Sequence, residues 1–319
     1  MKKIVVIGGG TGTSTLLTGL RKFDVELSAI VSMADNGGST GILRRELGVM
    51  PPGDIRQCLL ALSHADDEMK KLVAYRFDQG SLKGQNCGNL ILAALEKSTG
   101  NFESALKFAS EYLKVEGQVL PITLDDVNIK TQLTTGETLP GESSLHQANL
   151  KDFDHQELEP IATLNPRALD AINEADTIIF APGDFYSSVA PNFLVKGLPE
   201  AVRASQAKVI YIANLVTKAG HTDGWTVERF VEEIELRLQG KLDHVIYNNK
   251  LPSVEIFERY TNEGEKLVTF DPKNMIPPKY VGDDHLEIIS KGGPKKDLIV
   301  RSNIRHNPDL IAKAVFDFV

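Results

Sequence analysis

The first thirty residues constrain the fold most, because they combine a buried strand, a glycine-rich turn and a helix. Residues 4–7 form an uninterrupted β-branched run, which is typical of a parallel strand buried on both faces. Glycines at 8–12 interrupt this run, leucines then recur at helical spacing, and a second apolar run follows at 27–32. Two strands joined by a helix within about 30 residues predict a βαβ unit.

The same alternation of strand and helix patterns continues through the second half of the chain. Buried strands are predicted at 177–180, 209–212 and 245–247. The Asn-Pro pairs at 165–166 and 307–308 are typical helix starts, with Asn as the N-cap and Pro in the first turn. We therefore expect an α/β protein with a Rossmann-like, doubly wound, mostly parallel sheet and helices on both faces.

Two stretches interrupt the alternation without dividing the chain. Residues 53–115 are predicted to form a helical insertion. Residues 117–140 are predicted to form a small β excursion outside the main sheet, with a hairpin turn at Thr135-Gly136. We expect residues 1–319 to fold as a single domain, since doubly wound proteins often reach this size as one body.

Composition narrows the class of protein. With 35 basic and 43 acidic residues the net charge is −8, which argues against a nucleic-acid binder, because such proteins need a basic face. Cys58 and Cys87 have no partner at metal-ligand spacing and are interpreted as small apolar residues. No apolar run reaches the roughly 20 residues of a membrane span or resembles a signal peptide, so we expect a cytoplasmic protein.

The loop after the first strand is the first candidate ligand site. Its glycines allow backbone amides to approach an anion closely, and the following helix directs its positive end to the same place. The spacing departs from G-x-G-x-x-G, because Thr13 stands at the third glycine, and the loop lacks the Gly-Lys-Ser/Thr of a Walker A motif. A tight turn that serves packing is the alternative. The candidate phosphate contacts are Gly9, Gly10, Thr11 and Gly12.

A second glycine-rich loop follows the second strand. An acidic residue at this place often binds a ribose in dinucleotide folds, but here more glycines follow at once. Two such loops side by side would form a basin of backbone donors. An Asx-type turn without a ligand is the alternative. The candidate residues are Asp35, Asn36, Gly37, Gly38, Ser39 and Thr40.

Three further loops supply polar candidates. Asp54 is interpreted either as the N-cap of a helix or as a metal or substrate ligand, and Asn89 either as a cap or as a ligand contact. A loop directly after a predicted strand adds Asp184, Tyr186 and Ser187. The sequence contains no readable histidine cluster, Gly-x-Ser-x-Gly elbow or Cys/His nucleophile pair, so no catalytic residue and no metal ligand is assigned.

Taken in order, these loops resemble the family that joins the gluconeogenesis factors (YvcK-like) with the 2-phospho-L-lactate transferases (CofD-like). The resemblance covers nearly the whole chain. The ADNGGSTG, PPGDIR and IRHNP segments are closer to those of the gluconeogenesis factors. The matching segments are IGGGTG from Ile7, ADNGGSTG from Ala34, PPGDIR from Pro51, CGNLILAAL from Cys87, GES at 141–143, PGDFYSSVAPNFLVKGL from Pro182 and IRHNP from Ile304.

The resemblance implies a ligand and two functions. It implies a diphosphate at the two glycine loops, a base or sugar near Asn248 and a phosphate contact at Arg305. The gluconeogenesis-factor branch implies a regulator that binds a nucleotide sugar such as a UDP-sugar and is needed for growth and cell shape on gluconeogenic carbon sources. The transferase branch implies transfer from a nucleotide-diphosphate-linked donor, with magnesium on Asp35, Asp54 or Asp184.

We expect the regulator and keep the metal-assisted transferase as the alternative. An NAD-dependent oxidoreductase is disfavoured by the broken glycine motif. The chain also departs from the family pattern. Asp184, Lys218 and His221 stand where Ser, Gln and Glu are more usual, and Gln85-Asn86-Cys87 replaces a stretch that often carries His and an aromatic residue. A cofactor is not implied beyond magnesium for a transferase. The architecture is compatible with a homodimer, and the sequence names no protein partner.

Overall fold

A seven-stranded sheet forms the centre of the computed structural model, which describes residues 1–146, 148–252, 266–288 and 304–319. The strand order is β12-β10-β8-β7-β1-β2-β3, and every neighbouring pair is parallel. This confirms the predicted α/β fold. The strands are β1 (Lys2–Gly8), β2 (Val25–Val31), β3 (Gln118–Pro121), β7 (Thr177–Phe180), β8 (Lys208–Ile212), β10 (His244–Asn248) and β12 (Tyr280–Asp283).

The strand order changes direction between β1 and β7. The chain builds outward from β1 through β2 to β3, and then returns to the other side of β1 to add β7, β8, β10 and β12. In open parallel sheets, ligands bind beyond the carboxyl ends of the strands at such a switch point. The fold therefore brings the loops after β1 and β7 together.

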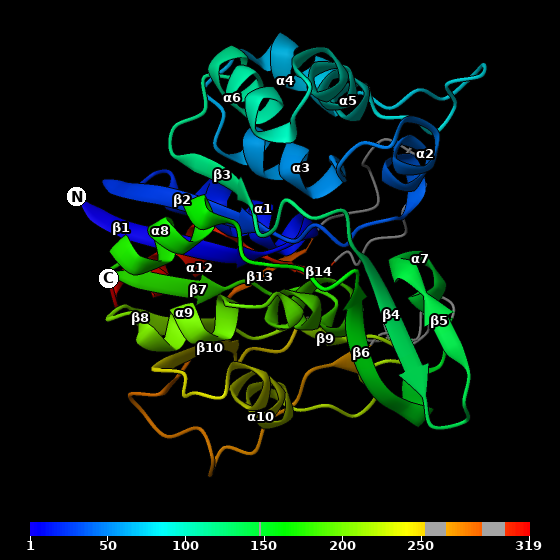
Figure 1. Ribbon diagram of the computed structural model, residues 1–319. Coiled ribbons are helices and arrows are strands. Elements are labelled where there is room, and N and C mark those ends of the chain that lie inside the picture. Colours follow the sequence, from blue (N-terminus) through cyan, green and yellow to red (C-terminus); the bar gives the residue numbers. More distant parts are fainter. Residues whose placement is uncertain (147, 253–265, 289–303) are drawn as a thin grey trace.

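Helices cover both faces of the sheet. On one face α1 (Gly10–Leu20) packs against α3 (Gly53–Ala61) and α12 (Pro308–Phe316). A second group consists of α8 (Pro166–Glu174), α9 (Leu198–Ala204) and α10 (Val227–Leu238), in which α9 packs on the other two. Figure 1 shows α12 behind the sheet and α8 and α9 in front of it.

The predicted helical insertion is confirmed between β2 and β3. It contains α3, α4 (Asp67–Ala74), α5 (Cys87–Thr99) and α6 (Phe102–Tyr112), and α2 (Gly38–Leu47) precedes it. The start of the predicted β excursion is wrong, because residues 118–121 pair with β2 as the edge strand of the main sheet. The hairpin itself is present as β4 (Asn128–Leu133) and β5 (Thr138–Pro140), and β6 (Phe153–Glu159) extends it to three antiparallel strands.

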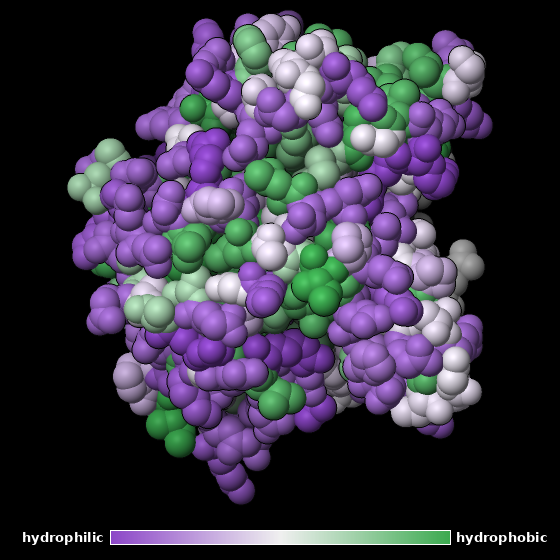
Figure 2. Space-filling view, in the orientation of Figure 1, coloured by the Kyte–Doolittle hydropathy of each residue, from purple (hydrophilic) through white to green (hydrophobic). Residues whose placement is uncertain are grey.

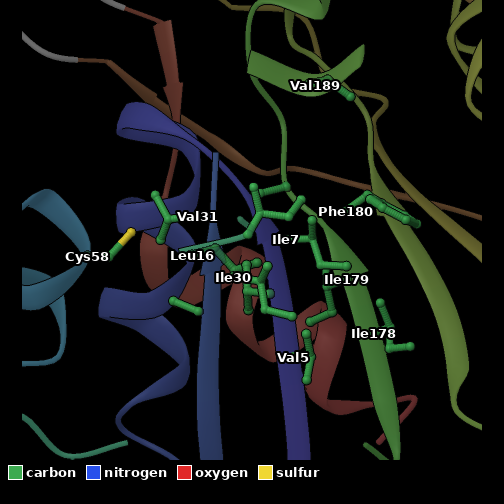
Figure 3. Close-up of a cluster of buried hydrophobic side chains, with 14 of the residues drawn as sticks. Val5, Ile7, Leu16, Ile30, Val31, Cys58, Ile178, Ile179, Phe180 and Val189 are labelled. Atoms are coloured by element: carbon green, nitrogen blue, oxygen red, sulfur yellow. The ribbon is translucent and has the colours of Figure 1, made fainter. Parts of the chain in front are cut away.

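The core lies where the central strands meet α1 and α3. Ile7, Ile30 and Ile179 come from three neighbouring strands, and Leu16 of α1 joins them (Figure 3). Each such side chain stabilises the fold by about 1.5–3 kcal/mol relative to exposure. Cys58 of α3 belongs to the same cluster, as predicted, and its burial raises the pKa of its thiol.

The outer surface and the remaining small elements complete the fold. Figure 2 shows one face as mostly hydrophilic, with hydrophobic residues gathered in a band across its middle. No helix in the described part of the chain is long and apolar enough to cross a membrane. The predicted homodimer and the single-domain boundaries stay predictions. The remaining short elements are α7 (Gly141–Leu145), β9 (Val216–Thr217), β11 (Lys266–Leu267), β13 (Leu286–Ile288) and β14 (Ile304–His306).

Candidate functional site

Three helices begin close together at the carboxyl edge of the sheet. α1 starts after β1, and α2 starts after the neighbouring strand β2. A Cβ atom built on Gly53, the first residue of α3, would lie 2.5 Å from Thr40 Oγ1 in the first turn of α2. A Cβ atom on Gly9, before α1, would lie 2.6 Å from the carboxylate oxygen of Asp54 in α3. The amino-terminal turns of the three helices therefore share one space.

These three helices differ from the others in how they begin. Among the described helices of eight or more residues, α4, α5, α6, α8, α10 and α12 each have an Asp, Asn or Thr side chain as the cap. α1, α2 and α3 have Gly9, Gly37 and Pro52 at that position and no side-chain cap. First-turn N–H groups without a cap, together with the helix dipole, attract an anion.

The loop after β7 forms the opposite wall of this space. A Cβ atom built on Gly12 would lie only 1.9 Å from the carbonyl oxygen of Pro182, so α1 touches this loop through bare backbone. Next to it, Asn214 Nδ2 donates a hydrogen bond of 2.7 Å to the carbonyl oxygen of Gly183. The loops after β1, β2 and β7, which the sequence singled out, thus belong to one site. We call it the glycine-loop site.

Asp54 faces the glycine-loop site and does not cap its helix. The N-cap of α3 is Pro52, and Asp54 lies inside the first turn. Its carboxylate lies beside Gly9 and Gly10, and Gln57 Nε2 donates to Asp54 Oδ1 at 3.2 Å. Of the two interpretations left open by the sequence, the N-cap is therefore wrong.

Asp35 and Glu142 form a second acidic element of the site. Gly37 N donates to Asp35 Oδ1 at 2.8 Å, and the carboxyl group of Glu142 hydrogen-bonds to Asp35. Asn36 holds α7 against the second glycine loop, because its Oδ1 accepts a 2.8 Å hydrogen bond from Ser143 N at the start of α7. Sequence reasoning did not select Glu142, although it lies in the matching segment GES.

Burial raises the pKa of Glu142 well above its ordinary value, and the charge of Asp35 and its hydrogen bond to Glu142 raise it further. The more distant charges of Asp54 and Asp184 act in the same direction. The surroundings of Glu142 therefore favour its protonated form, and its carboxyl group is hydrogen-bonded to Asp35. A divalent cation would compete with this proton.

We expect Glu142→Gln to raise the stability of the ligand-free protein at pH 7. A carboxyl group whose pKa is raised on folding stabilises the fold below its unfolded value of about 4.3, and this stability is lost as pH rises through the folded pKa. The amide keeps the shape and cannot ionise, so its urea midpoint should exceed that of the wild type at pH 7 and match it near pH 4. Equal midpoints at both pH values would contradict the raised pKa.

Asp184, Lys218 and His221 form a charged group at the other side of the site. Asp184 Oδ2 pairs with Lys218 Nζ, and Asp184 Oδ1 lies 3.5 Å from His221 Nδ1. Burial opposes ionisation of Asp184, but the hydrogen bonds and charges of His221 and Lys218 together hold its pKa well below its usual range. Asp184 is thus a carboxylate that already has partners. Lys218 and His221, which like Asp184 depart from the family pattern, thus both lie next to the Asp184 carboxylate.

His146 connects the two acidic elements. Its Nδ1 lies 3.4 Å from Lys218 Nζ, and its Nε2 lies 3.6 Å from Glu142 Oε1. Burial, followed by the positive charge of Lys218, lowers the pKa of His146. Lys218 and His146 therefore bring polar and basic atoms to a site that is otherwise acidic. Sequence reasoning named Lys218 only as a departure from the family pattern, and it did not select His146.

Asn89 supports the second glycine loop from behind. The cap of α5 is Asn86, whose Oδ1 accepts from Asn89 N at 3.1 Å, so the cap interpretation of Asn89 is wrong. The Asn89 side chain accepts from Arg56 Nε at 2.9 Å and donates to Ser39 Oγ at 3.3 Å. Ser39 in turn donates to Gln85 Oε1 at 2.8 Å. This buried network orients the first turn of α2.

Two predicted contacts, Asn248 and Arg305, lie outside the loops after β1, β2 and β7, although β14, which carries Arg305, packs against α1. Asn248 ends β10, which is the third strand from β1, about 14 Å away at the usual strand spacing. Its Nδ2 donates to Lys250 O at 2.5 Å and its Oδ1 accepts from His285 N at 3.0 Å. Arg305 lies on β14, opposite Glu287 of β13. Both positions stay predictions as contacts of an extended ligand.

Tyr186 and Ser187 lie in the π-helical turn Phe185–Val189 that follows the β7 loop. The Tyr186 ring packs 4.7 Å from Phe153 and 5.9 Å from Trp225, measured between ring centroids. It therefore contributes to an aromatic cluster beyond Asp184. Ser187 is buried.

The carboxyl groups of the glycine-loop site could supply some of the ligands of a magnesium ion. In the described ranges, no group of three or more His, Cys, Asp or Glu side chains is arranged to hold a metal ion. Magnesium, however, usually binds one or two carboxylates, several waters and the phosphates of its substrate. The paired carboxyls of Asp35 and Glu142, next to uncapped helix starts, supply the protein's share of such a donor set.

Comparisons with known proteins agree with these loops. The model of the CofD family, described as 2-phospho-L-lactate transferase CofD, matches residues 4–282. A relative from Thermotoga maritima is 43% identical over 274 residues, which are 86% of this chain and 87% of that protein. The gluconeogenesis factor of Bacillus subtilis is 35% identical over 325 residues, covering 99% of this chain and 98% of the relative.

A crystal structure has the same fold over its full length. It is described as a member of the UPF0052 family from Bacillus halodurans, and it is 34% identical to this chain. The TM-score is 0.90, and the match covers 99% of this chain and 100% of that one.

Proposed function

This chain belongs to the CofD family, with relatives named gluconeogenesis factor, and on that premise we propose that it is a regulatory protein that binds a nucleotide-diphosphate sugar. The observation that carries the proposal is the convergence of three uncapped helix starts on one space. Such N–H groups bind phosphate groups, and three of them side by side suit a diphosphate. We propose that the nucleoside or sugar extends from this space toward Asn248, and that UDP-sugars are the ligands.

The charges of the site support binding without turnover. Asp184 is already paired with Lys218 and His221, and the carboxyl group of Glu142 is hydrogen-bonded to Asp35. A bound diphosphate would replace some of these interactions with its own and so change the packing of α2 against α7. We propose that this change is the signal that a protein partner reads during growth and cell-shape control on gluconeogenic carbon sources. We place the protein in the cytoplasm, consistent with its two free thiols.

Calorimetric titration tests the proposal. The purified protein would be titrated with UDP-N-acetylglucosamine, UDP-glucose, GDP and NAD, each with and without magnesium. We expect magnesium-independent binding of a UDP-sugar and no steady consumption of it. Gly38→Asp should weaken this binding at least 30-fold, about 2 kcal/mol, because it puts a carboxylate at the uncapped start of α2, where a Cβ meets nothing within 4 Å.

Gly48→Asp is the matched control for Gly38→Asp. Gly48 also has a left-handed backbone and open space around its Cβ position, but it lies at the other end of α2. Its binding should stay within about threefold of the wild type. Equal losses in both variants would reject the uncapped helix starts as the diphosphate site.

The hydrogen-bonded pair of Asp35 and Glu142 favours a second candidate, a metal-assisted transferase that acts on a nucleotide-diphosphate-linked donor. These two residues would hold magnesium, which when bound would offset negative charge on the phosphate groups. The chain's own residues would bind the donor at α1 and α2 and orient it with Asp54. A magnesium requirement together with a preference for GDP in the same titration would favour this candidate.

A further inference from the structure

A second pocket lies beyond Asp184, on the side of the molecule formed by β6 and α10. Its volume is about 480 Å³. None of the residues that line it belongs to the loops after β1 or β2, and it adjoins the glycine-loop site at Tyr186 and His221. Its lining consists of Asn149, Leu150, Lys151, Phe153, Tyr186, Gly220, His221, Asp223, Trp225, Arg229 and Glu233.

Aromatic rings form the apolar part of this pocket. Phe153 and Tyr186 are inclined by 44° to each other, and Tyr186 and Trp225 by 67°. Rings inclined in this way do not form two parallel walls that could hold a flat nucleobase between them. They suit a puckered ring, whose C–H groups can lie against the electron-rich faces of several aromatic side chains.

The charged groups of the pocket balance each other. Lys151 and Arg229 contribute two cations, and Asp223 and Glu233 contribute two carboxylates. Arg229 is paired with Glu233 and lies 5.5 Å from the Trp225 ring centroid. A pocket without net charge gives little attraction to a phosphate, unlike the glycine-loop site. It offers donors and acceptors side by side, which is what neighbouring hydroxyl groups require.

A buried histidine is shared by the pocket and the charged group around Asp184. His221 lines the pocket, and its Nε2 donates to the carbonyl oxygen of Leu145 at 2.7 Å. Its Nδ1 lies 3.5 Å from Asp184 Oδ1. The pocket therefore adjoins the glycine-loop site at this imidazole ring.

We propose that this pocket is a second binding site, and that it takes a neutral saccharide ring. The inclined aromatic rings receive the C–H faces of the sugar. Asn149, Asp223 and Tyr186 line the pocket and supply polar atoms for its hydroxyl groups. The proposal does not depend on the function of the glycine-loop site.

Trp225 makes the proposal directly testable, because it is the only tryptophan of the chain. Glucose, galactose and N-acetylglucosamine would be titrated into the protein, with UDP-N-acetylglucosamine as the comparison ligand and with Trp225 fluorescence and saturation-transfer NMR of the ligand as the two readouts. We expect at least one of these sugars to give a saturable response in both. Asp223→Asn and Tyr186→Phe should each weaken it at least fivefold. Tyr112→Phe, in an exposed ring of α6, is the matched control and should leave it unchanged.

Each outcome decides the proposal. No saturation transfer from any of the three sugars, or equal transfer in wild type and both pocket variants, would overturn it. A response only to UDP-N-acetylglucosamine that disappears in Gly38→Asp would also overturn it, because the pocket would then be an extension of the glycine-loop site. A free-sugar response that persists in Gly38→Asp supports it. Failure of nucleotide binding alone would reject the proposed function and leave this site in place.

Discussion

Gly12→Ala is expected to lower the free energy of unfolding by about 3 kcal/mol or more, the upper part of the range for overpacking. The added Cβ would lie 1.9 Å from the carbonyl oxygen of Pro182 and 3.0 Å from its carbonyl carbon. Both partners are backbone, so no side chain can rotate away, and α1 has to separate from the loop after β7. The same shift opens the glycine-loop site, and binding of a UDP-sugar should be lost.

Urea unfolding followed by circular dichroism measures the first effect, and calorimetry measures the second. Gly38→Ala is the matched control, since its Cβ would meet nothing within 4 Å. Its left-handed backbone, with φ of 45°, limits the expected cost to about 1–2 kcal/mol. If Gly12→Ala were as stable as Gly38→Ala, the loops after β1 and β7 would not touch in solution, and the site described above would be wrong.

Local patterns explain why much of the fold was predictable. The β-branched run of β1, the glycines after it and the Asn-Pro helix starts each depend on residues that are neighbours in sequence. The edge strand β3 was misassigned for the opposite reason. Only its pairing with β2, about 90 residues earlier in the chain, places it in the main sheet. Nothing in its own four residues distinguishes it from the hairpin that follows.

The candidate site divides in the same way. The glycine loops could be predicted because glycines and helix starts are recognised from residues that are neighbours in the sequence. Glu142 was missed because its role depends on Asp35, which lies more than 100 residues earlier and meets it only in the folded chain. Asp54 looked like a cap, since an acidic residue near a helix start usually is one, but the helix begins two residues earlier than that interpretation needs.

Asp184→Ala is expected to destabilise the protein by about 3 kcal/mol at neutral pH. Removing one member of a buried ion pair leaves its partners without compensation, which typically costs 3–5 kcal/mol. We take the lower end, because the side chain of Lys218 is 34% exposed and water can replace part of the lost contact. Water cannot replace the lost contact of His221 in this way, since its side chain is fully buried.

The pH dependence gives this prediction its sign. The pKa of Asp184 is lowered on folding, so its contribution to stability is present above the unfolded value of about 3.9. It is lost as pH falls through the folded pKa. The urea midpoints of wild type and Asp184→Ala should therefore differ most at pH 6–8 and converge as the pH is lowered toward 3.

Asp184→Ala combined with Lys218→Met separates the pair from the rest of the site. If the ion pair carries the effect, the double variant should recover part of the stability that Asp184→Ala loses, because no uncompensated ammonium group remains. Asp176→Ala is the control for a carboxylate of the exposed edge, which pairs with Lys2, and it should change little. Wild-type and Asp184→Ala midpoints that run parallel from pH 7 to pH 3 would contradict an ionised, paired Asp184. The departures from the family pattern at Asp184, Lys218 and His221 would then have to be explained separately.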